Sequence, residues 1–370
     1  MKEHERGDIS DIVHAEGVSP PVGLREVYAK YFLFGNILSP PDLDCADILV
    51  DFRHHYNALT AENAMKPMYI TSARGEYDFS QVDKLVGWAN ASGIKMVGHT
   101  FIWHSQSAAW LNKNADGSPV TRAEARANME AFIKTYASKY SGKIHSWDVL
   151  NEAMRDADEF TGNWRTHLRH AETDTYPAFW YLAYANGASE KECGSDYIFD
   201  AFYFARKYDP AAILYYNDYN DEVPAKREAI AQMVEEMNAR WQAHPEYDGR
   251  LLIEGIGMQA HYNEGTDLNN VRESLTRFIQ TGAKISVTEL DITFGTGEDP
   301  AVPLLAEQSR RQAEMYAELF DMYVEFSAHI ERVSMWARHD GNSWRSWGSP
   351  VLFDGSGQPK EAFKAVCRVR

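Results

Sequence analysis

Short apolar runs alternate with longer amphipathic stretches along most of the chain. The apolar runs, rich in β-branched and aromatic residues, predict eight strands at 32–37, 58–61, 95–100, 146–150, 213–217, 252–258, 285–290 and 333–336. Apolar residues at helical spacing predict helices at 24–31, 40–56, 81–92, 122–139, 195–208, 226–243, 268–280 and 305–326. Such alternation is typical of a parallel sheet, and eight strand–helix units predict an α/β fold, a single (β/α)8 TIM barrel.

A doubly wound open sheet is the rival architecture. It has little support, because no G-x-G-x-x-G pattern follows the first predicted strand. Residues 1–22 are polar and end in Ser19-Pro20-Pro21, which predicts an N-terminal extension before a barrel domain over 23–370. One connection is unusually long, an insertion at about 155–194 after the fourth strand. Its aromatic residues include Trp164, Tyr176, Trp180, Tyr181 and Tyr184.

Polar side chains follow almost every predicted strand. In order along the chain they are Glu62, Asn63 and Lys66; His99, Trp103, His104 and Gln106; Asn151 and Glu152; Tyr219 and Asn220; Gln259 and His261; Glu289 and Asp291; and Trp336. In a (β/α)8 barrel the carboxyl ends of all strands share one face and surround one pocket. The sequence therefore predicts a functional site at this face.

The residue types at the strand ends limit the chemistry of the site. Glu289 and Asp291 stand two apart on one strand face, which taken alone is also compatible with solvated surface acids. The chain has no G-x-S-x-G elbow, and the spacing of His99, His104 and His261 matches no H-E-x-x-H zinc site. We therefore expect neither a metal nor a cofactor. Two carboxyls, Glu152 and Glu289, among amides and indoles are what hydrolysis of a glycosidic bond requires.

Composition narrows the partners. Among 370 residues, 54 are acidic and 37 are basic, a net charge of −17, which argues against nucleic acid and anionic membranes as partners. No run of 18 apolar residues predicts a membrane span, and no apolar signal-peptide core follows Met1. Cys45, Cys193 and Cys367 are few and far apart. A cytoplasmic location is expected, with secretion after signal removal as the alternative.

The strand-end motifs resemble those of glycoside hydrolase family 10, the (β/α)8 endo-β-1,4-xylanases. Six motifs in the family's order carry the resemblance, which covers roughly residues 24–366: 60–66, 99–106, 148–152, 216–220, 255–261 and 288–291. The resemblance implies that residues 23–370 form a catalytic domain. It also implies a retaining endo-1,4-β-xylanase acting on xylan or xylo-oligosaccharides.

The resemblance also implies residue roles. Glu289 matches the nucleophile and Glu152 the general acid/base, with their carboxyls about 5–5.5 Å apart as retention requires. His261 would hold Glu289, with Asp291 behind it, and Asn151 would bind the sugar 2-hydroxyl. The residues expected to bind substrate are Glu62, Asn63, Lys66, His99, Trp103, Gln106, Tyr219, Gln259, Trp336 and Trp344.

Two features depart from the family pattern. The family's Trp-Gly-x-x-Asp-x-x-Ser-Trp stretch reads here Trp336-Ala337-Arg338-His339-Asp340-Gly341-Asn342-Ser343-Trp344, which leaves open whether the glycone pocket is altered. The insertion is expected to narrow the cleft or to add stacking platforms from Trp164, Trp180 or Tyr184.

Alternatives remain open at this point. A β-1,4-glucanase of the same fold and a catalytically silent sugar-binding protein would both use such a pocket. Other notable residues are expected to be structural: Trp88, Trp110 and Trp241 in packing, and His54, His55, Asp218 and Asp221 at the surface or in turns.

Overall fold

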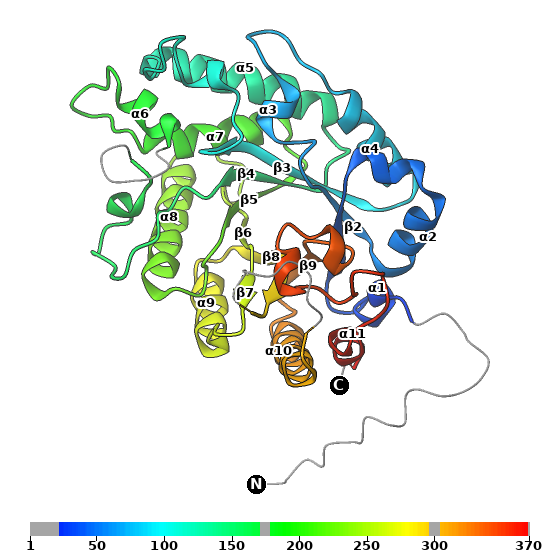
Figure 1. Ribbon diagram of the computed structural model, residues 1–370. Helices are drawn as coiled ribbons and strands as arrows, with labels where there is room; N and C mark the ends of the chain where they lie inside the picture. Colours follow the sequence, from blue (N-terminus) through cyan, green and yellow to red (C-terminus); the bar gives the residue numbers. More distant parts are fainter. Residues whose placement is uncertain (1–21, 171–177, 296–303, 369–370) are drawn as a thin grey trace.

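The computed structural model describes residues 22–170, 178–295 and 304–368 (Figure 1). The expected extension therefore lies outside the described residues except for Val22, and so does Tyr176 of the insertion. The strands within the described ranges are β1 (Leu33–Leu38), β2 (Ala58–Ala61), β3 (Lys95–Trp103), β4 (Ser146–Asn151), β5 (Ile213–Asp218), β6 (Gly255–Met258), β7 (His261–Asn263), β8 (Lys284–Thr293) and β9 (Ile330–Met335).

The strands form a closed parallel barrel. Neighbours pair in the order β6-β5-β4-β3-β2-β1-β9-β8, and pairing of β6 with β8 closes the ring. The short β7 pairs with β8 beyond the end of β6, so β6 and β7 together take one place in the barrel. The predicted (β/α)8 barrel is confirmed, and each of the eight predicted strands overlaps one barrel strand.

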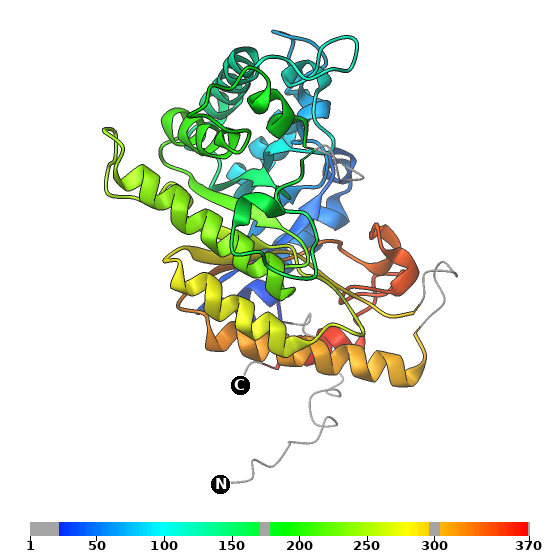
Figure 2. The same ribbon diagram turned by 90° about the vertical axis from the view of Figure 1, so that its left-hand side faces the viewer.

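Helices surround the barrel, as the two views in Figures 1 and 2 show. The α-helices in the described ranges are α1 (Leu24–Val27), α2 (Ala46–His55), α3 (Pro67–Ile70), α4 (Ser80–Ala91), α5 (Arg122–Tyr140), α6 (Phe179–Ala185), α7 (Asp196–Tyr208), α8 (Pro224–Gln242), α9 (Leu268–Gln280), α10 (Ala306–Glu325) and α11 (Glu361–Val366). Short 3-10 turns are η2 (Pro40–Asp44), η3 (Ala109–Leu111), η4 (Trp164–His167), η5 (Asp340–Asn342) and η6 (Ser346–Gly348).

Local sequence explains where the outer helices begin and which face they bury. α9 starts after Asp267, whose side chain accepts a hydrogen bond from Asn269 N, and it buries residues at helical spacing, including Leu268, Val271 and Leu275. None of the helices in the described ranges combines the length and the apolar character that a membrane-spanning helix requires.

Several predicted boundaries are wrong, among them the end of β3, which lies at Trp103, and the start of β9, which lies at Ile330. The strand expected at 252–258 begins only at Gly255. The helix expected at 24–31 ends at Val27, because Tyr28 leaves helical geometry. The helix expected at 40–56 is divided into η2 and α2, because Cys45 between them is extended.

Close packing between the barrel and its outer helices depends on a glycine, because Trp147 of β4 packs against Tyr136 of α5. A Cβ atom at Gly98 of β3 would lie 2.0 Å from Cε3 of Trp147 on β4. Trp147 is fully buried and stacks on Phe101 with ring centroids 4.1 Å apart. Glycine is therefore required here to leave room for the indole.

Candidate active site

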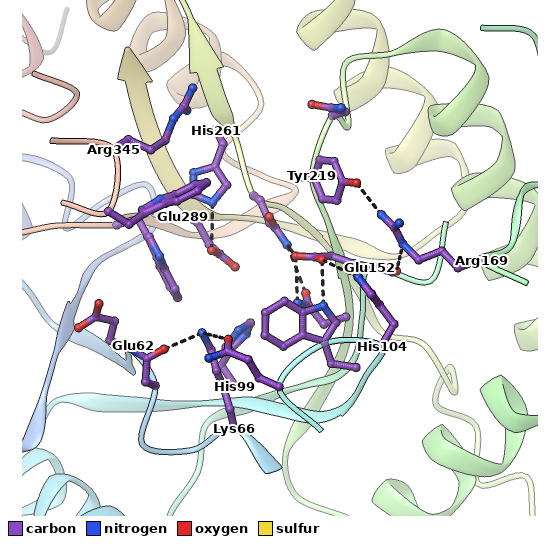
Figure 3. Close-up of a pocket in the computed structure, with 18 residues that line it drawn as sticks. Glu62, Lys66, His99, His104, Glu152, Arg169, Tyr219, His261, Glu289 and Arg345 are labelled. Carbon is purple, nitrogen blue, oxygen red and sulfur yellow. Dashed lines mark hydrogen bonds and ion pairs between the residues drawn. The ribbon is translucent and has the colours of Figure 1, made fainter. Parts of the chain in front are cut away.

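A cavity of about 630 Å³ opens at the carboxyl ends of the barrel strands (Figure 3). It is lined by Glu62, Asn63, Lys66, His99, Trp103, His104, Gln106, Asn151, Glu152, Arg169, Tyr219, Asn220, Gln259, His261, Glu289, Trp336, Trp344 and Arg345. All the residues predicted as catalytic or substrate-binding are in this set. Of the three predicted supporting residues, Asn151 and His261 line the cavity and Asp291 lies behind His261.

Glu152 follows β4 with a positive φ of 54°, which turns its side chain into the cavity. Its carboxylate accepts hydrogen bonds from Trp103 Nε1 at 2.9 Å and from Gln259 Nε2 at 2.9 Å. Burial raises the pKa of Glu152, and the negative charges of Asp218 and Glu289 act in the same direction. The Gln259 and Trp103 donors oppose this rise without cancelling it. The surroundings of Glu152 therefore shift it toward the protonated form relative to an ordinary glutamate.

Glu289 lies on β8 and has the opposite electrostatic surroundings. It accepts hydrogen bonds from His261 Nε2 at 3.2 Å and from Asn217 Nδ2 at 3.0 Å. Burial alone would raise the pKa of Glu289, but the His261 hydrogen bond and the charges of His99, His261 and Lys66 lower it below the ordinary value. The surroundings of the two carboxyls therefore shift their pKa values in opposite directions.

The His261 ring joins two carboxylates. Its Nδ1 lies 3.0 Å from Asp291 Oδ2, while Nε2 faces Glu289. Burial opposes a charge on this ring, but Asp291 and Glu289 raise the pKa of His261 to about 10. The ring is therefore a cation near neutral pH and can donate from both nitrogens. This is the arrangement expected from the sequence for His261 and Asp291.

One side of the cavity is rich in amide and amine groups. Lys66 Nζ donates to Asn63 Oδ1 and Gln106 Oε1, each at 2.9 Å, and lies 5.1 Å from the centre of the Trp103 ring. Glu62 Oε2 accepts a hydrogen bond from the Ser39 hydroxyl at 2.6 Å. These groups form a rigid polar surface that can bind hydroxyl groups.

Two indoles that follow β9, Trp336 and Trp344, also line the cavity. Trp336 is buried and meets His99 edge to face, with ring centroids 5.7 Å apart. Trp344 is 63% exposed and contacts His261 edge to face at 5.1 Å. An exposed indole fixed beside a catalytic centre provides a face for a sugar ring.

The three residues that depart from the family pattern lie outside the cavity lining. In the described part of the chain, Ala337, Arg338 and His339 are not among the lining residues. Arg338 instead points to η2, where it pairs with Asp42 at 2.9 Å. This ion pair fastens the loop after β9 to η2.

The far side of the cavity, beyond Glu152, is built from the insertion and the end of β5. Arg169 Nη2 donates to the Tyr219 hydroxyl at 2.5 Å (Figure 3). This hydroxyl in turn donates to Asp156 at 3.1 Å. Lys226 lies 3.5 Å from the centre of the Tyr219 ring and pairs with Asp218 at 2.9 Å. Tyr219 is thereby held rigidly at the cavity wall.

Several structural expectations are wrong. Trp164, Trp180 and Tyr184 of the insertion are buried, so they are packing residues and not stacking platforms. Asp218 and Asp221 are buried too, because each accepts hydrogen bonds from a buried tyrosine hydroxyl. His55 is also buried, against Phe353 and Phe363, and burial lowers its pKa to about 4.

Sequence reasoning gave no role to four lining residues: His104, Arg169, Asn220 and Arg345. His104 and Asn220 belong to the quoted motifs, so their position could have been anticipated. Nothing near Arg169 in the sequence indicates a site, whereas Arg345 directly follows Trp344, a residue expected to bind substrate. Within the described ranges, no group of three or more His, Cys, Asp and Glu side chains is placed to hold a metal ion.

A (β/α)8 barrel whose cavity holds two carboxyls with oppositely shifted pKa values among amides and indoles is the arrangement expected of a class of enzymes, the glycoside hydrolases. The chain belongs to one family of these enzymes: residues 23–369 match the model of Glycosyl hydrolase family 10.

The sequences of known relatives align with most of this chain. Endo-1,4-beta-xylanase B of Paenibacillus barcinonensis is 32% identical over 322 residues, covering 84% of this chain and 87% of the relative. Endo-1,4-beta-xylanase of Geobacillus stearothermophilus is 31% identical over 363 residues, covering 94% and 98%. Among solved structures, a GH10 xylanase from termite gut that contains a bacterial Ig-like domain superposes with a TM-score of 0.82 at 37% identity, covering 94% of this chain and 77% of that one.

Proposed function

We propose that this glycoside hydrolase is a retaining endo-1,4-β-xylanase that cleaves xylan and xylo-oligosaccharides, with Glu289 as the nucleophile and Glu152 as the general acid/base. One observation carries the proposal. The two carboxyls share a cavity, and their surroundings move the pKa of Glu152 up and the pKa of Glu289 down. A retaining glycosidase needs an acid and an ionised nucleophile side by side. The named activities of the relatives support the substrate class.

In the first step, a Glu289 oxygen attacks the anomeric carbon while the bond from that carbon to the leaving oxygen breaks. Glu152 gives its proton to the leaving oxygen, so the departing sugar leaves as a neutral alcohol. The donors from Asn217 and His261 hold the Glu289 carboxylate in place for this attack. The products are a covalent glycosyl-enzyme and a shortened chain.

In the second step, Glu152 is ionised and takes a proton from water as the water oxygen attacks the anomeric carbon. The bond to Glu289 breaks, and the sugar is released with its original anomeric configuration. Trp103 and Gln259, which donate to Glu152, favour its ionised form during this step. The same two donors thus keep the pKa of Glu152 within a range that permits both roles.

The glycone side favours a pentose over a hexose. Xylose lacks the hydroxymethyl group of glucose, so a crowded site discriminates against glucose by a steric clash. Lys66, Trp336 and Trp344 provide the crowding in this proposal, since all three line the same cavity. A β-1,4-glucanase would accept a nitrophenyl cellobioside at a rate comparable to that of the xylobioside, and this comparison separates the two activities.

The mechanism is tested by trapping the intermediate. A 2-deoxy-2-fluoro xylobioside with a good leaving group should label the enzyme once, and peptide mass spectrometry should place the label on Glu289. Proton NMR of early products from xylohexaose should show the β-anomer first. Glu289→Gln should fold normally and release no reducing ends from xylan. Labelling elsewhere, or an α-anomer as the first product, would remove the retaining assignment, and wild-type enzyme without activity would indicate a silent sugar-binding protein.

A further inference from the structure

Arg345 links the loop after β9 to the strand that carries Glu289. Its Nη1 lies 2.6 Å from Asp291 Oδ1 and 3.0 Å from the Tyr262 carbonyl oxygen, and its Nη2 donates to Thr293 Oγ1 at 2.8 Å. Both terminal nitrogens of the guanidinium therefore donate hydrogen bonds to neighbouring residues of β7 and β8. A fork held at three points has little freedom to turn.

Four groups of alternating charge, Arg345, Asp291, His261 and Glu289, form a continuous chain that ends at the proposed nucleophile. Figure 3 shows three of them: Arg345, His261 and Glu289. The links are Arg345–Asp291 at 2.6 Å, Asp291–His261 at 3.0 Å and His261–Glu289 at 3.2 Å. Asp291 has no exposed surface, so solvent cannot stabilise its charge. A buried carboxylate of this kind requires charged or hydrogen-bonding partners on both oxygens.

We propose that Arg345 is a positioning residue for Glu289: it fixes the Asp291 carboxylate, Asp291 fixes the His261 ring, and His261 aims the Glu289 carboxylate and balances its charge. The proposal rests on the assignment of Glu289 as the nucleophile. It extends the support of that residue by one member, from the barrel strands into the loop that carries Trp344.

The charge of Arg345 has a definite consequence for the proposed nucleophile. With Arg345 present, the two cations and the two carboxylates of the chain are formally neutral as a group. Without it, the group carries one net negative charge in a buried place, and ionised Glu289 becomes less favourable. The pKa of Glu289 should therefore rise when Arg345 is made neutral.

Other charged groups also face these carboxylates and must remain unchanged in a test. Those near Glu289 are His261, Asp291, His99, Lys66 and Glu152, and the Tyr316 hydroxyl group of α10 lies near Asp291. Replacement of Arg345 removes none of them. A shift in the titration of Glu289 can then be assigned to the guanidinium.

Arg345 has a second set of contacts that a test must separate. Its backbone N–H donates to Ser343 Oγ at 3.0 Å, and its guanidinium carbon lies 5.8 Å from the centre of the Trp344 ring. Loss of the side chain could therefore displace the indole and raise KM. A displaced indole removes a contact with the sugar but leaves the charge around Glu289 unchanged.

The experiment measures kcat/KM against pH for an aryl xylobioside with a good leaving group, so that protonation of Glu152 matters little. Arg345→Met should move the acidic limb to higher pH by about half a unit to one unit, because a neighbouring charge that acts through one intermediary shifts a pKa less than one in contact. Arg345→Lys should return the limb close to its wild-type position. Arg345→Ala should regain activity with added guanidinium chloride but not with sodium chloride at equal ionic strength.

Two variants serve as controls, and thermal unfolding monitors the fold of each. Trp344→Ala should raise KM without moving the acidic limb. Arg272→Met removes an exposed arginine that pairs with Glu325 at 2.8 Å, and it should change neither quantity. An unmoved limb in Arg345→Met, or an equal movement in Trp344→Ala, overturns the inference while the fluorosugar label on Glu289 still supports the proposed function. If wild-type enzyme takes no label, the function fails and the inference fails with it.

Discussion

Replacing Trp103 with phenylalanine should raise the pKa of Glu152 and move the basic limb of activity to higher pH. The change keeps an aromatic ring but removes one N–H donor, which lies 2.9 Å from Glu152 Oε2. This donor favours the ionised carboxylate. A general acid is active while protonated, so a raised pKa extends activity toward alkaline pH.

The size of the shift follows from the geometry. A hydrogen bond to a charged group contributes about 1.5–3 kcal/mol, and one pKa unit corresponds to about 1.36 kcal/mol. Full loss would therefore raise the pKa by about one to two units. The second donor, Gln259, remains at 2.9 Å, and the Glu152 side chain is 14% exposed, so water can replace part of the lost bond. We expect about one unit, at the lower end of the range.

The assay is the pH dependence of kcat/KM on xylotetraose, whose poor leaving group requires protonation. Trp110→Phe is the matched control, because its indole N–H donates to the neutral Thr71 hydroxyl at 3.1 Å and not to a carboxylate. The control should leave the basic limb in place. A basic limb that stays fixed or moves to lower pH in Trp103→Phe would refute the assignment of Glu152 as the acid.

Three further changes test the remaining structure. Asp291→Asn should lower kcat/KM by about ten- to a hundredfold, since His261 loses a charged partner, while the fluorosugar should still label the nucleophile. Lys226→Met should lower the free energy of unfolding in urea by about 3–5 kcal/mol, because it leaves a buried carboxylate without its cation. Gly98→Ala should lower that free energy by at least about 1–3 kcal/mol through collision with Trp147, whereas Gly87→Ala, in an open helical position, should raise it by about 0.5–1 kcal/mol.

The predictable part of the molecule is the part governed by local pattern. The alternation of strand-like and helix-like hydrophobic patterns predicted the barrel. Because all barrel strands end at one face, the polar residues at the strand ends were then expected around one cavity. This reasoning works because all parallel strands end on the same face, so a residue such as Gln259 is located by its strand alone. The break between β6 and β7 was not predicted, because nothing in the sequence indicates that Ala260 adopts a positive φ.

Long-range partners were the unpredictable part. Arg345 pairs with a carboxylate 54 residues away in sequence, and Arg169 meets a hydroxyl 50 residues away. Asp218 resembles a turn residue in sequence, yet its buried partner Lys226 lies one turn into the next helix. The sequence alone does not show whether a charged side chain is solvated or paired with an opposite charge.

The insertion illustrates the difference between composition and function. Its aromatic residues suggested sugar platforms, but Trp164 donates to Glu236 of α8 and Tyr184 donates to Asp200 of α7, so both fasten the insertion to the outer helices.

Among the insertion residues that the structure describes, Arg169 is the one that lines the cavity. It also contacts the backbone of Glu152. A φ of 54° is unfavourable for glutamate and persists only where neighbours enforce it. Glu152 N donates to the Asn217 carbonyl oxygen at 2.9 Å, and Arg169 Nε donates to the Glu152 carbonyl oxygen at 3.0 Å. The insertion therefore acts on the orientation of the proposed acid/base, since it supplies one of the two bonds that hold the peptide on either side of this residue.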